Sequence, residues 1–356
     1  MNFKNAFTTG VATISAALLL TACGTHHSKS SNSKDTKYSI ALITNNTGVD
    51  DHSFNQSAWN GLQKYGKKFG LSKGNGGYNY FESSSASDHV PNIEQAISAK
   101  YKMIVGVGYE LGDAINSESK KHPNTNFIMI DNTINRKNVV SATFKSQDAS
   151  YLAGVAAAYS TKTNTVGFIG GAHNVIVDLF DAGFTQGVKD AAKKLHKKIK
   201  VLNQYVGNFS STDKAQMIAK SMYSNNADII YHAAATAGEG VFQAAKAIDQ
   251  KTNENGKVWV IGVDSDQSSL GKYKMKNGTA SNLTLSSVMK GIGKACYEIA
   301  VQSHEGKFPG GKHLVFGLKG DGTYLLKGYI NSAAWKAVNT AKQQIIDNKI
   351  TVATKP

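Results

Sequence analysis

The chain has 356 residues, 41% of them hydrophobic, and it carries a formal net charge of +15 at pH 7. This length is enough for two compact lobes or domains. The basic residues are scattered, and their densest run, at 193–200, has the spacing of a solvated helix end. No helix-turn-helix pattern precedes the core, so we expect a basic body beside an anionic envelope and no nucleic-acid partner.

Residues 1–22 have the pattern of a secretory signal peptide. Lys4 gives a positive start, and the apolar stretch at 11–20 is too short to span a membrane stably. The next residues, Leu-Thr-Ala-Cys at 20–23, resemble the bacterial lipobox, which places a diacylated cysteine at the mature amino terminus. We therefore expect Cys23 to anchor the chain by lipid to the extracytoplasmic face of a bacterial cell membrane. The alternative is an ordinary signal peptide followed by an unmodified cysteine.

Residues 23–37 comprise this cysteine and a stretch rich in Ser, Lys, Asn and His, which predicts a flexible tether. Residues 38–356 remain for a two-lobed domain. The other cysteine, Cys296, has no disulfide partner if Cys23 carries lipid. Its apolar neighbours indicate a buried side chain rather than a reactive thiol.

From residue 38 onward, short β-rich runs alternate with helical periods. The first series predicts strands at 38–44, 78–81, 103–107, 127–131 and 139–144, with helices at 53–69, 93–100 and 111–121. The second predicts strands at 165–169, 200–205, 229–231 and 258–263, with helices at 179–195, 212–224 and 239–251. The tail predicts a helix at 286–303, strands at 314–316 and 323–326, and a helix at 333–348. Such alternation is typical of parallel sheets covered on both faces.

Two such series predict two α/β lobes. Lobe 1 takes about 38–145 and part of 268–310, and lobe 2 takes about 146–267 and part of 311–356. A tail shared in this way makes the chain cross between the lobes three times. Because no Gly/Ser-rich linker follows residue 37, short hinge segments are expected at the crossings.

The carboxyl ends of the predicted strands carry small, acidic or aromatic residues, and ligands of open parallel sheets bind at these ends. The residues are Asp50 to Asn55, Gly108 to Glu110, Asp131 and Asn132, Gly207 to Ser210, Ala237 to Gly240, and Asp264 to Asp266. Each group alone is an ordinary turn or helix cap. Together they predict a cleft for a neutral, hydroxyl-rich ligand with a flat ring.

The same segments resemble the basic membrane protein family of substrate-binding lipoproteins, which includes nucleoside-binding proteins of ABC transporters. The resemblance covers essentially the whole mature chain. Its most specific stretches are DDHSFNQSAWNGL, NFIMIDN, SATFKSQDASYLAGVAAA, VGFIGG, FDAGFTQGVK, SMYSNNADIIYHAAATAGEGVF and VWVIGVDSDQ. The resemblance implies a type I periplasmic-binding fold, with two doubly wound parallel-sheet lobes joined by a hinge. It also implies a nucleoside ligand, with purine nucleosides as first candidates, a permease and an ATPase as partners, and no cofactor.

The resemblance further implies roles for individual residues. Phe54 and Phe209 would sandwich the base, and Asp264 would accept both ribose hydroxyls, since a carboxylate offers two oxygens to a cis-diol. Asn55 and Asp131 would hydrogen-bond the base edge, Gly238 would let a backbone amide come close, and Lys290 would add a donor. Asp51 or Asp50 would contact the sugar or the base. The complete predicted ligand-binding set is Asp50, Asp51, Ser53, Phe54, Asn55, Asp131, Phe209, Gly238, Asp264 and Lys290.

Two stretches differ from the family pattern. AAATAGEG at 233–240 stands where a Gly-Thr-Gly turn is common, and Ser-Thr-Asp at 211–213 replaces the usual Asp-Pro after the aromatic turn. These differences leave the family assignment intact and the substrate open.

Structural roles compete with the ligand roles. Asp50, Asp51 or Asp264 could cap a helix or turn, Phe54 could pack in the core, and Lys290 could be solvated.

An enzyme is the main rival class, because the GVDD stretch at 48–51 resembles nucleoside hydrolases. Their calcium site needs further aspartates where this chain has Thr44 and Asn46, so a divalent cation would be poorly held. We therefore expect binding without catalysis and no metal. A surface sensor or adhesin, or a protein for another hydroxylated small molecule, is compatible with the same residues.

Overall fold

The computed structural model describes residues 38–252 and 256–356. The predicted signal peptide, the predicted lipidation site Cys23 and the tether up to residue 37 lie outside the described residues. Among the helices of the described part, none combines the length and the apolar character that a membrane span requires.

The first sheet consists of six parallel strands in the order β13-β5-β4-β3-β1-β2. Its strands are β1 (Ile40–Ile43), β2 (Tyr78–Phe81), β3 (Met103–Val107), β4 (Asn126–Ile130), β5 (Val139–Phe144) and β13 (His313–Phe316). Side chains of β1 alternate between the two faces. Ile40 and Leu42 pack with α1 (Phe54–Phe69) and α8 (Ile292–His304). Ala41 and Ile43 pack with α2 (His89–Ser98) and α3 (Gly112–Lys121). Because helices cover both faces, a strand such as β3 is buried along its whole length.

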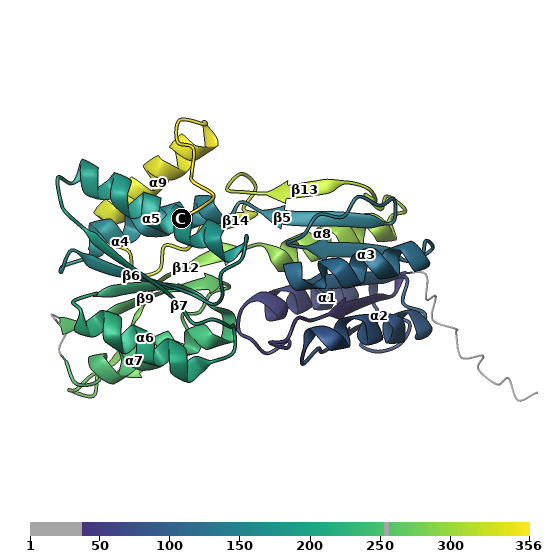
Figure 1. The fold of residues 1–356 in the computed structure, drawn as a ribbon, viewed down its shortest axis with the longest axis horizontal. Coiled ribbons are helices and arrows are strands. Elements are labelled where there is room, and N and C mark those ends of the chain that lie inside the picture. The colour runs from purple at the N-terminus through teal and green to yellow at the C-terminus, as the bar shows by residue number, and fades with distance from the viewer. Residues whose placement is uncertain (1–37, 253–255) are drawn as a thin grey trace, which may run out of the picture. The chain divides into compact units, whose positions relative to one another are not determined.

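The second sheet has the order β14-β12-β9-β8-β6-β7, and only β14 runs antiparallel to its neighbour. Its strands are β6 (Thr165–Gly170), β7 (Lys200–Tyr205), β8 (Ile229–Ala233), β9 (Trp259–Asp264), β12 (Thr284–Lys290) and β14 (Thr323–Leu325). One face packs against α4 (Ser146–Ser160), α5 (Val177–Lys194) and α9 (Ser332–Ile346). The other packs against α6 (Thr212–Ser224) and α7 (Glu239–Asp249), as Figure 1 shows. A small antiparallel pair, β10 (Lys272–Lys274) and β11 (Ala280–Asn282), completes the strands of the described residues.

The chain passes between the two sheets after β5, after β12 and after β13. The crossing segments are hydrogen-bonded to one another. Lys145 donates its backbone N–H to the carbonyl of Phe316 at 2.8 Å, and Gly291 donates to the carbonyl of Gly322 at 2.8 Å. The segments that join the sheets therefore lie side by side. Within 268–310, β12 belongs to the second sheet and α8 packs on the first. Within 311–356, β13 joins the first sheet, whereas β14 and α9 belong with the second.

The predicted α/β class with parallel sheets is confirmed, but some elements were wrong or missed. The helix predicted at 286–303 begins only at Ile292, because residues Thr284–Lys290 form strand β12. That strand is buried between neighbours and lacks the polar alternation that would mark it as a strand. Helix α4 was missed because it is buried almost throughout and shows no polar face. Cys296 is fully buried in α8 as expected, and burial raises the pKa of its thiol to about 12.

Candidate functional site

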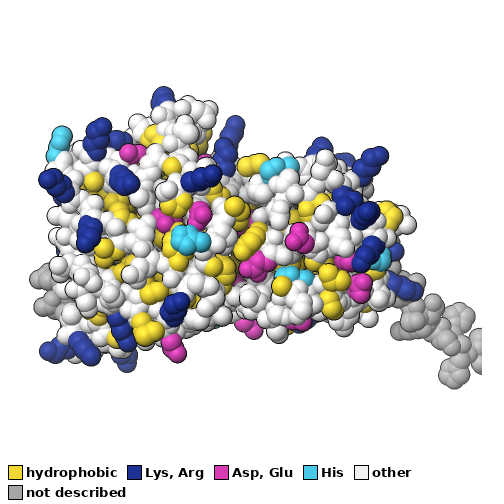
Figure 2. Space-filling view, viewed as in Figure 1, with side chains coloured by type: hydrophobic (Ala, Val, Ile, Leu, Met, Phe, Trp, Pro, Cys, Tyr) yellow, Lys and Arg dark blue, Asp and Glu magenta, His cyan; other side chains and the backbone are white. Residues whose placement is uncertain are grey.

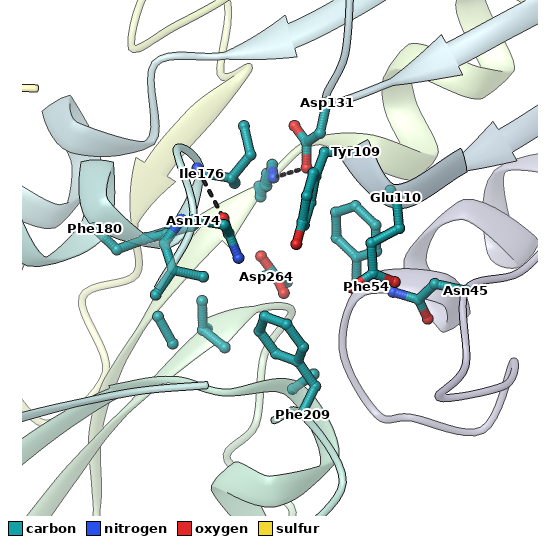
Figure 3. Close-up of a pocket in the computed structure, with 16 residues that line it drawn as sticks. Asn45, Phe54, Tyr109, Glu110, Asp131, Asn174, Ile176, Phe180, Phe209 and Asp264 are labelled. Atoms are coloured by element: carbon teal, nitrogen blue, oxygen red, sulfur yellow. Dashed lines mark hydrogen bonds and ion pairs between the residues drawn. The ribbon is translucent and has the colours of Figure 1, made fainter. Parts of the chain in front are cut away.

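A cavity lies at the carboxyl ends of the strands of both sheets, where this fold class binds ligands. It encloses about 560 Å³ of space free of protein atoms, its open side included. Residues after strands of the first sheet and residues after strands of the second both line it (Figure 3). The polar and aromatic lining residues are Asn45, Phe54, Tyr109, Glu110, Asp131, Asn174, Phe180, Phe209, Asp264 and Lys290.

Asp131 and Asp264 place one carboxylate from each sheet at this cavity. Asp131 directly follows β4, and Asp264 ends β9; these strands hold the same position in the order of their sheets. Both residues have a left-handed backbone, with φ of 66° at Asp131 and 63° at Asp264. Few residues other than glycine adopt this conformation, and aspartate is among those that tolerate it. Strained backbone of this kind is found preferentially at functional sites.

Asp131 forms a buried ion pair with Lys290, which ends strand β12. The Lys290 ammonium also lies over three aromatic rings, 4.8 Å from the centroid of Phe54, 5.2 Å from Phe144 and 5.7 Å from Phe180. Lys290 is only 3% exposed, so the alternative of a solvated lysine is wrong. The second oxygen of Asp131, Oδ1, is buried without a hydrogen-bond partner among the described residues. The pair thus joins the two sheets and leaves one acceptor at the cavity.

Asp264 has a different environment. Ser53, at the start of α1, donates its hydroxyl to Asp264 Oδ2 at 2.7 Å. Burial raises the pKa of Asp264 to about 6, although the nearby Lys290 charge and the Ser53 hydrogen bond lower it. The carboxylate is therefore mostly ionised at neutral pH, and a ligand hydroxyl that donated to it would relieve part of the cost of burying its charge.

Asp51 is held by the start of helix α1. Its carboxylate accepts hydrogen bonds from the backbone N–H groups of Ser53 at 3.0 Å, Asn55 at 2.8 Å and Gln56 at 3.1 Å. These bonds satisfy donors that the first turn of a helix leaves without partners. Asp51 does not line the cavity, and its neighbour Asp50 is exposed to solvent and does not line it either. The structure therefore gives Asp51 the capping role that was the alternative to ligand contact.

Asn55 also lies behind the cavity wall rather than on it. Its side-chain amide donates to Asn45 Oδ1 at 2.7 Å, to Thr47 Oγ1 at 2.8 Å and to Asp51 Oδ2 at 3.0 Å. Asn45, which Asn55 holds in place, lines the cavity instead. Asn45 was missed, although it lies two residues after β1 and so follows a strand end as the predicted residues do.

Gly238 serves a packing contact. A Cβ atom at this position would lie 2.0 Å from Nδ1 of the fully buried His232. Burial lowers the pKa of His232 to about 4, and its Nε2 lies 2.9 Å from Gln267 Oε1. The side chain is thus a neutral core histidine, and Gly238 is not among the residues that line the cavity.

The two aromatic residues of the predicted sandwich both reach the cavity. Phe54 is half-buried at the start of α1, and Phe209 is half-buried in the turn between β7 and α6. Gly171 permits the position of Phe209, because a Cβ atom there would lie 2.3 Å from the Phe209 ring. Figure 3 shows both rings and the Asp264 carboxylate turned toward the same space. Phe54 also contacts the core of the first sheet, so its packing role and its exposure to the cavity coexist.

Five of the predicted residues therefore line the cavity, namely Phe54, Asp131, Phe209, Asp264 and Lys290, and Ser53 bonds to one of them. Tyr109 and Glu110 were recognised as strand-end residues but were assigned no contact, and Asn174 was missed. Asn174 Oδ1 accepts the backbone N–H groups of Ile176 and Val177, each at 2.9 Å. Across residues 38–252 and 256–356, no group of three or more His, Cys, Asp or Glu side chains is arranged to hold a metal ion.

Comparisons with known proteins agree with this architecture. The Bmp family model, described as ABC transporter substrate-binding protein PnrA-like, matches residues 37–355. The chain is 43% identical over 354 residues to the "ABC transporter nucleoside-binding protein BmpA" of Lactococcus lactis subsp. cremoris, covering 99% of both chains. It is 44% identical over 349 residues to the "CD4+ T-cell-stimulating antigen" of Listeria innocua, covering 96% of both. A solute-binding protein of an ABC transporter system from Aeropyrum pernix K1 has a similar fold, with a TM-score of 0.75, 21% identity, and coverage of 89% of this chain and 93% of that one.

Proposed function

The chain belongs to the PnrA-like family of ABC transporter substrate-binding proteins, and from this membership we propose that it captures a nucleoside, with purine nucleosides as first candidates. It would deliver the nucleoside to the permease and ATPase of an importer. The observation that carries the proposal is a cavity with two aromatic rings, Phe54 and Phe209, and a strand-end carboxylate, Asp264. This is the combination that a flat base joined to a sugar diol needs.

In the proposed complex the base lies between Phe54 and Phe209. Stacking on aromatic rings stabilises each base by about 1–3 kcal/mol in single-strand binders and accepts any flat ring. The ribose hydroxyls donate to Asp264, whose Oδ2 is already oriented by Ser53. Asp131 Oδ1, the buried acceptor beside Lys290, offers a further hydrogen bond to the ligand.

The proposed ligand is bound and released without a chemical change. Two of the three acidic groups at the cavity have partners within the protein: Asp131 pairs with Lys290, and Asp264 accepts from Ser53. A calorimetric titration of the chain from Gly24 onward with a panel of five ribonucleosides tests the proposal. We expect saturable heat with at least one purine nucleoside, and chromatography after prolonged incubation should recover that nucleoside intact. No saturable heat with any of them would contradict nucleoside binding, and the appearance of free base and ribose would contradict the absence of chemistry.

We also propose that Cys23 carries the membrane anchor and that nucleic acid is not a partner. The Lys and Arg side chains are dispersed over the face seen in Figure 2 rather than gathered into one stripe. A dispersed charge does not follow a phosphate backbone. Mass spectrometry of the membrane-bound protein should find a diacylated amino-terminal cysteine, and an unmodified Cys23 would exclude the anchor.

A further inference from the structure

Glu110 places a carboxylate at the cavity that neither the ion pair nor the Ser53 hydrogen bond uses. It lies in the short helical turn Tyr109–Leu111, directly after strand β3. The residue is half-buried and lines the cavity. Figure 3 shows its side chain beside Phe54 and Asn45. Of the hydrogen bonds and ion pairs found in the described part of the chain, none involves the Glu110 carboxylate.

The other two lining carboxylates have partners within the protein. Asp131 faces the Lys290 ammonium, and Asp264 accepts the Ser53 hydroxyl. A partly buried carboxylate without a donor is unfavourable, because burial removes water that would otherwise solvate its charge. Burial accordingly raises the pKa of Glu110 above its usual value. A ligand that brings hydrogen-bond donors to Glu110 would replace the hydrogen bonds from water that burial removes.

The turn that carries Glu110 lies against the edge of the Phe54 ring. A Cβ atom on Gly108 would lie 3.6 Å from Cε1 of Phe54 and 3.5 Å from Nδ2 of Asn45. Gly108 has a φ of 117°, a conformation that residues with a side chain rarely adopt. The turn is thus held close to the ring on which we propose that the base stacks, and Glu110 lies beside that ring (Figure 3).

We propose that Glu110 determines base preference by accepting two hydrogen bonds from the N1–H and 2-amino groups of guanine. This inference rests on the proposed nucleoside-binding function. An ionised carboxylate is an acceptor only, and its two oxygens match two parallel donors. Hypoxanthine offers the N1–H alone. Adenine presents the N1 lone pair beside its 6-amino group, so one carboxylate oxygen would face another acceptor. The expected order of affinity is guanosine, then inosine, then adenosine.

The test compares Glu110→Gln with the charge-matched control Asp113→Asn, which changes an exposed residue of α3 that does not line the cavity. Guanosine, inosine and adenosine are titrated into the wild type and both variants, and thermal unfolding checks that each variant is folded. Glu110→Gln should weaken guanosine binding by about 10- to 100-fold, as expected for the loss of charge-assisted hydrogen bonds. The affinity for inosine should fall by a smaller factor. Adenosine should be unchanged or bind more tightly, because the new amide can donate to N1 and accept from the 6-amino group. Asp113→Asn should leave all three affinities as they are.

Three outcomes overturn the inference. Equal losses for the three nucleosides in Glu110→Gln would show a general electrostatic role rather than base recognition. Unchanged affinities for all three nucleosides in Glu110→Gln would remove Glu110 from the site while leaving nucleoside binding intact. Failure of the wild type to bind any of the three would remove this inference, and failure to bind any of the five ribonucleosides would remove the proposed function as well. If Glu110→Gln does not fold, Glu110→Ala is measured in the same way, with loss of guanosine preference as the expected result.

Discussion

Asp131 and Asp264 occupy corresponding places in the two sheets, with the same backbone conformation, and differ in what faces them. Asp131 forms an ion pair with the buried ammonium of Lys290, whereas Asp264 lies near that charge and accepts a hydrogen bond from the neutral hydroxyl of Ser53. The first carboxylate has its counter-charge inside the protein. The second is buried with a hydrogen bond and, among the residues that the structure describes, has no ion pair of its own. The same left-handed backbone at a strand end therefore has different results in the two halves of the fold. At Asp131 it gives an ion pair between the sheets, and at Asp264 it gives an acceptor suited to ligand hydroxyls.

The largest effect is expected from removing the counter-charge of Asp131. Lys290→Met keeps an unbranched apolar chain among the phenylalanine rings but leaves the Asp131 carboxylate buried and unpaired. Loss of one partner of a buried ion pair costs about 3–5 kcal/mol of the free energy of unfolding. Chemical denaturation of the ligand-free protein measures this loss.

Two controls show whether the loss comes from the unpaired charge. The double variant Lys290→Met/Asp131→Asn should recover most of the lost stability, because it no longer buries a charge. Lys294→Met breaks an exposed pair with Glu298, with side chains 46% and 42% exposed, and should change stability by less than about 1 kcal/mol. If the double variant were as unstable as the single one, the ion pair would not explain the role of Lys290.

The second-largest effect is expected on the affinity for ribonucleosides. Asp264→Asn keeps the shape of the side chain and one oxygen acceptor, but it removes the charge that the ribose hydroxyls are proposed to bind. We expect ribonucleoside binding to weaken by about 2–4 kcal/mol, since charge-assisted hydrogen bonds contribute about 1.5–3 kcal/mol each before compensation. The binding of a 2′-deoxyribonucleoside should weaken less, because this ligand lacks one of the two hydroxyl donors. Titration calorimetry with the two sugars gives the comparison.

Phe209→Leu is the matched control for that comparison. It should weaken both sugars alike, by about 1–3 kcal/mol, because stacking recognises the base and not the diol. Equal losses for ribose and deoxyribose in Asp264→Asn would take Asp264 out of the diol role.

The same carboxylate predicts a pH dependence of stability. Burial raises the pKa of Asp264 from its usual 3.8 to about 6, so the folded protein binds this proton more tightly than the unfolded chain does. Protonation therefore stabilises the fold; the contribution is complete below about pH 3.8 and is lost as pH rises through about 6. Between pH 7 and pH 4 the ligand-free wild type should gain roughly 2–3 kcal/mol over Asp264→Asn. Parallel stability curves of the two proteins over this range would mean that burial does not penalise the Asp264 charge.

The strand-end residues that form this site were predictable from sequence, and their partners were not. Asp131 and Asp264 each follow an apolar run, and such runs mark buried parallel strands whose ends meet at one edge. The Lys290–Asp131 contact joins residues 159 positions apart on different sheets, so no local pattern records it. For the same reason Lys290 was equally compatible with a solvated position. Strand β12, which carries Lys290, was taken for the start of a helix, since burial on both faces removes the alternation that separates the two.

Local chemistry likewise fails to distinguish Asp50, Asp51 and Asn55 from true lining residues. They share composition and sequence neighbourhood with Phe54, and only the direction in which α1 begins decides which of them face the cavity. In this stretch Phe54 lines the cavity and Asn55 does not, because the Asn55 amide points back toward Asn45 and Thr47.

The smallest effect is expected at Asp51, a third buried carboxylate, whose partners include three backbone N–H groups at the start of α1. Asp51→Ala should lower the free energy of unfolding by about 0.5–2 kcal/mol, the usual cost of losing a helix-capping side chain. Its effect on affinity should be of the same size for ribose and deoxyribose nucleosides, since Asp51 acts on the ligand only through the position of α1. Chemical denaturation and titration of the two sugars measure these quantities, and Asp51→Asn should recover part of the stability because asparagine also caps helices. A loss specific to the ribose sugar with unchanged stability would instead make Asp51 a ligand contact, and Asp264 would no longer be the sole acceptor proposed for the diol.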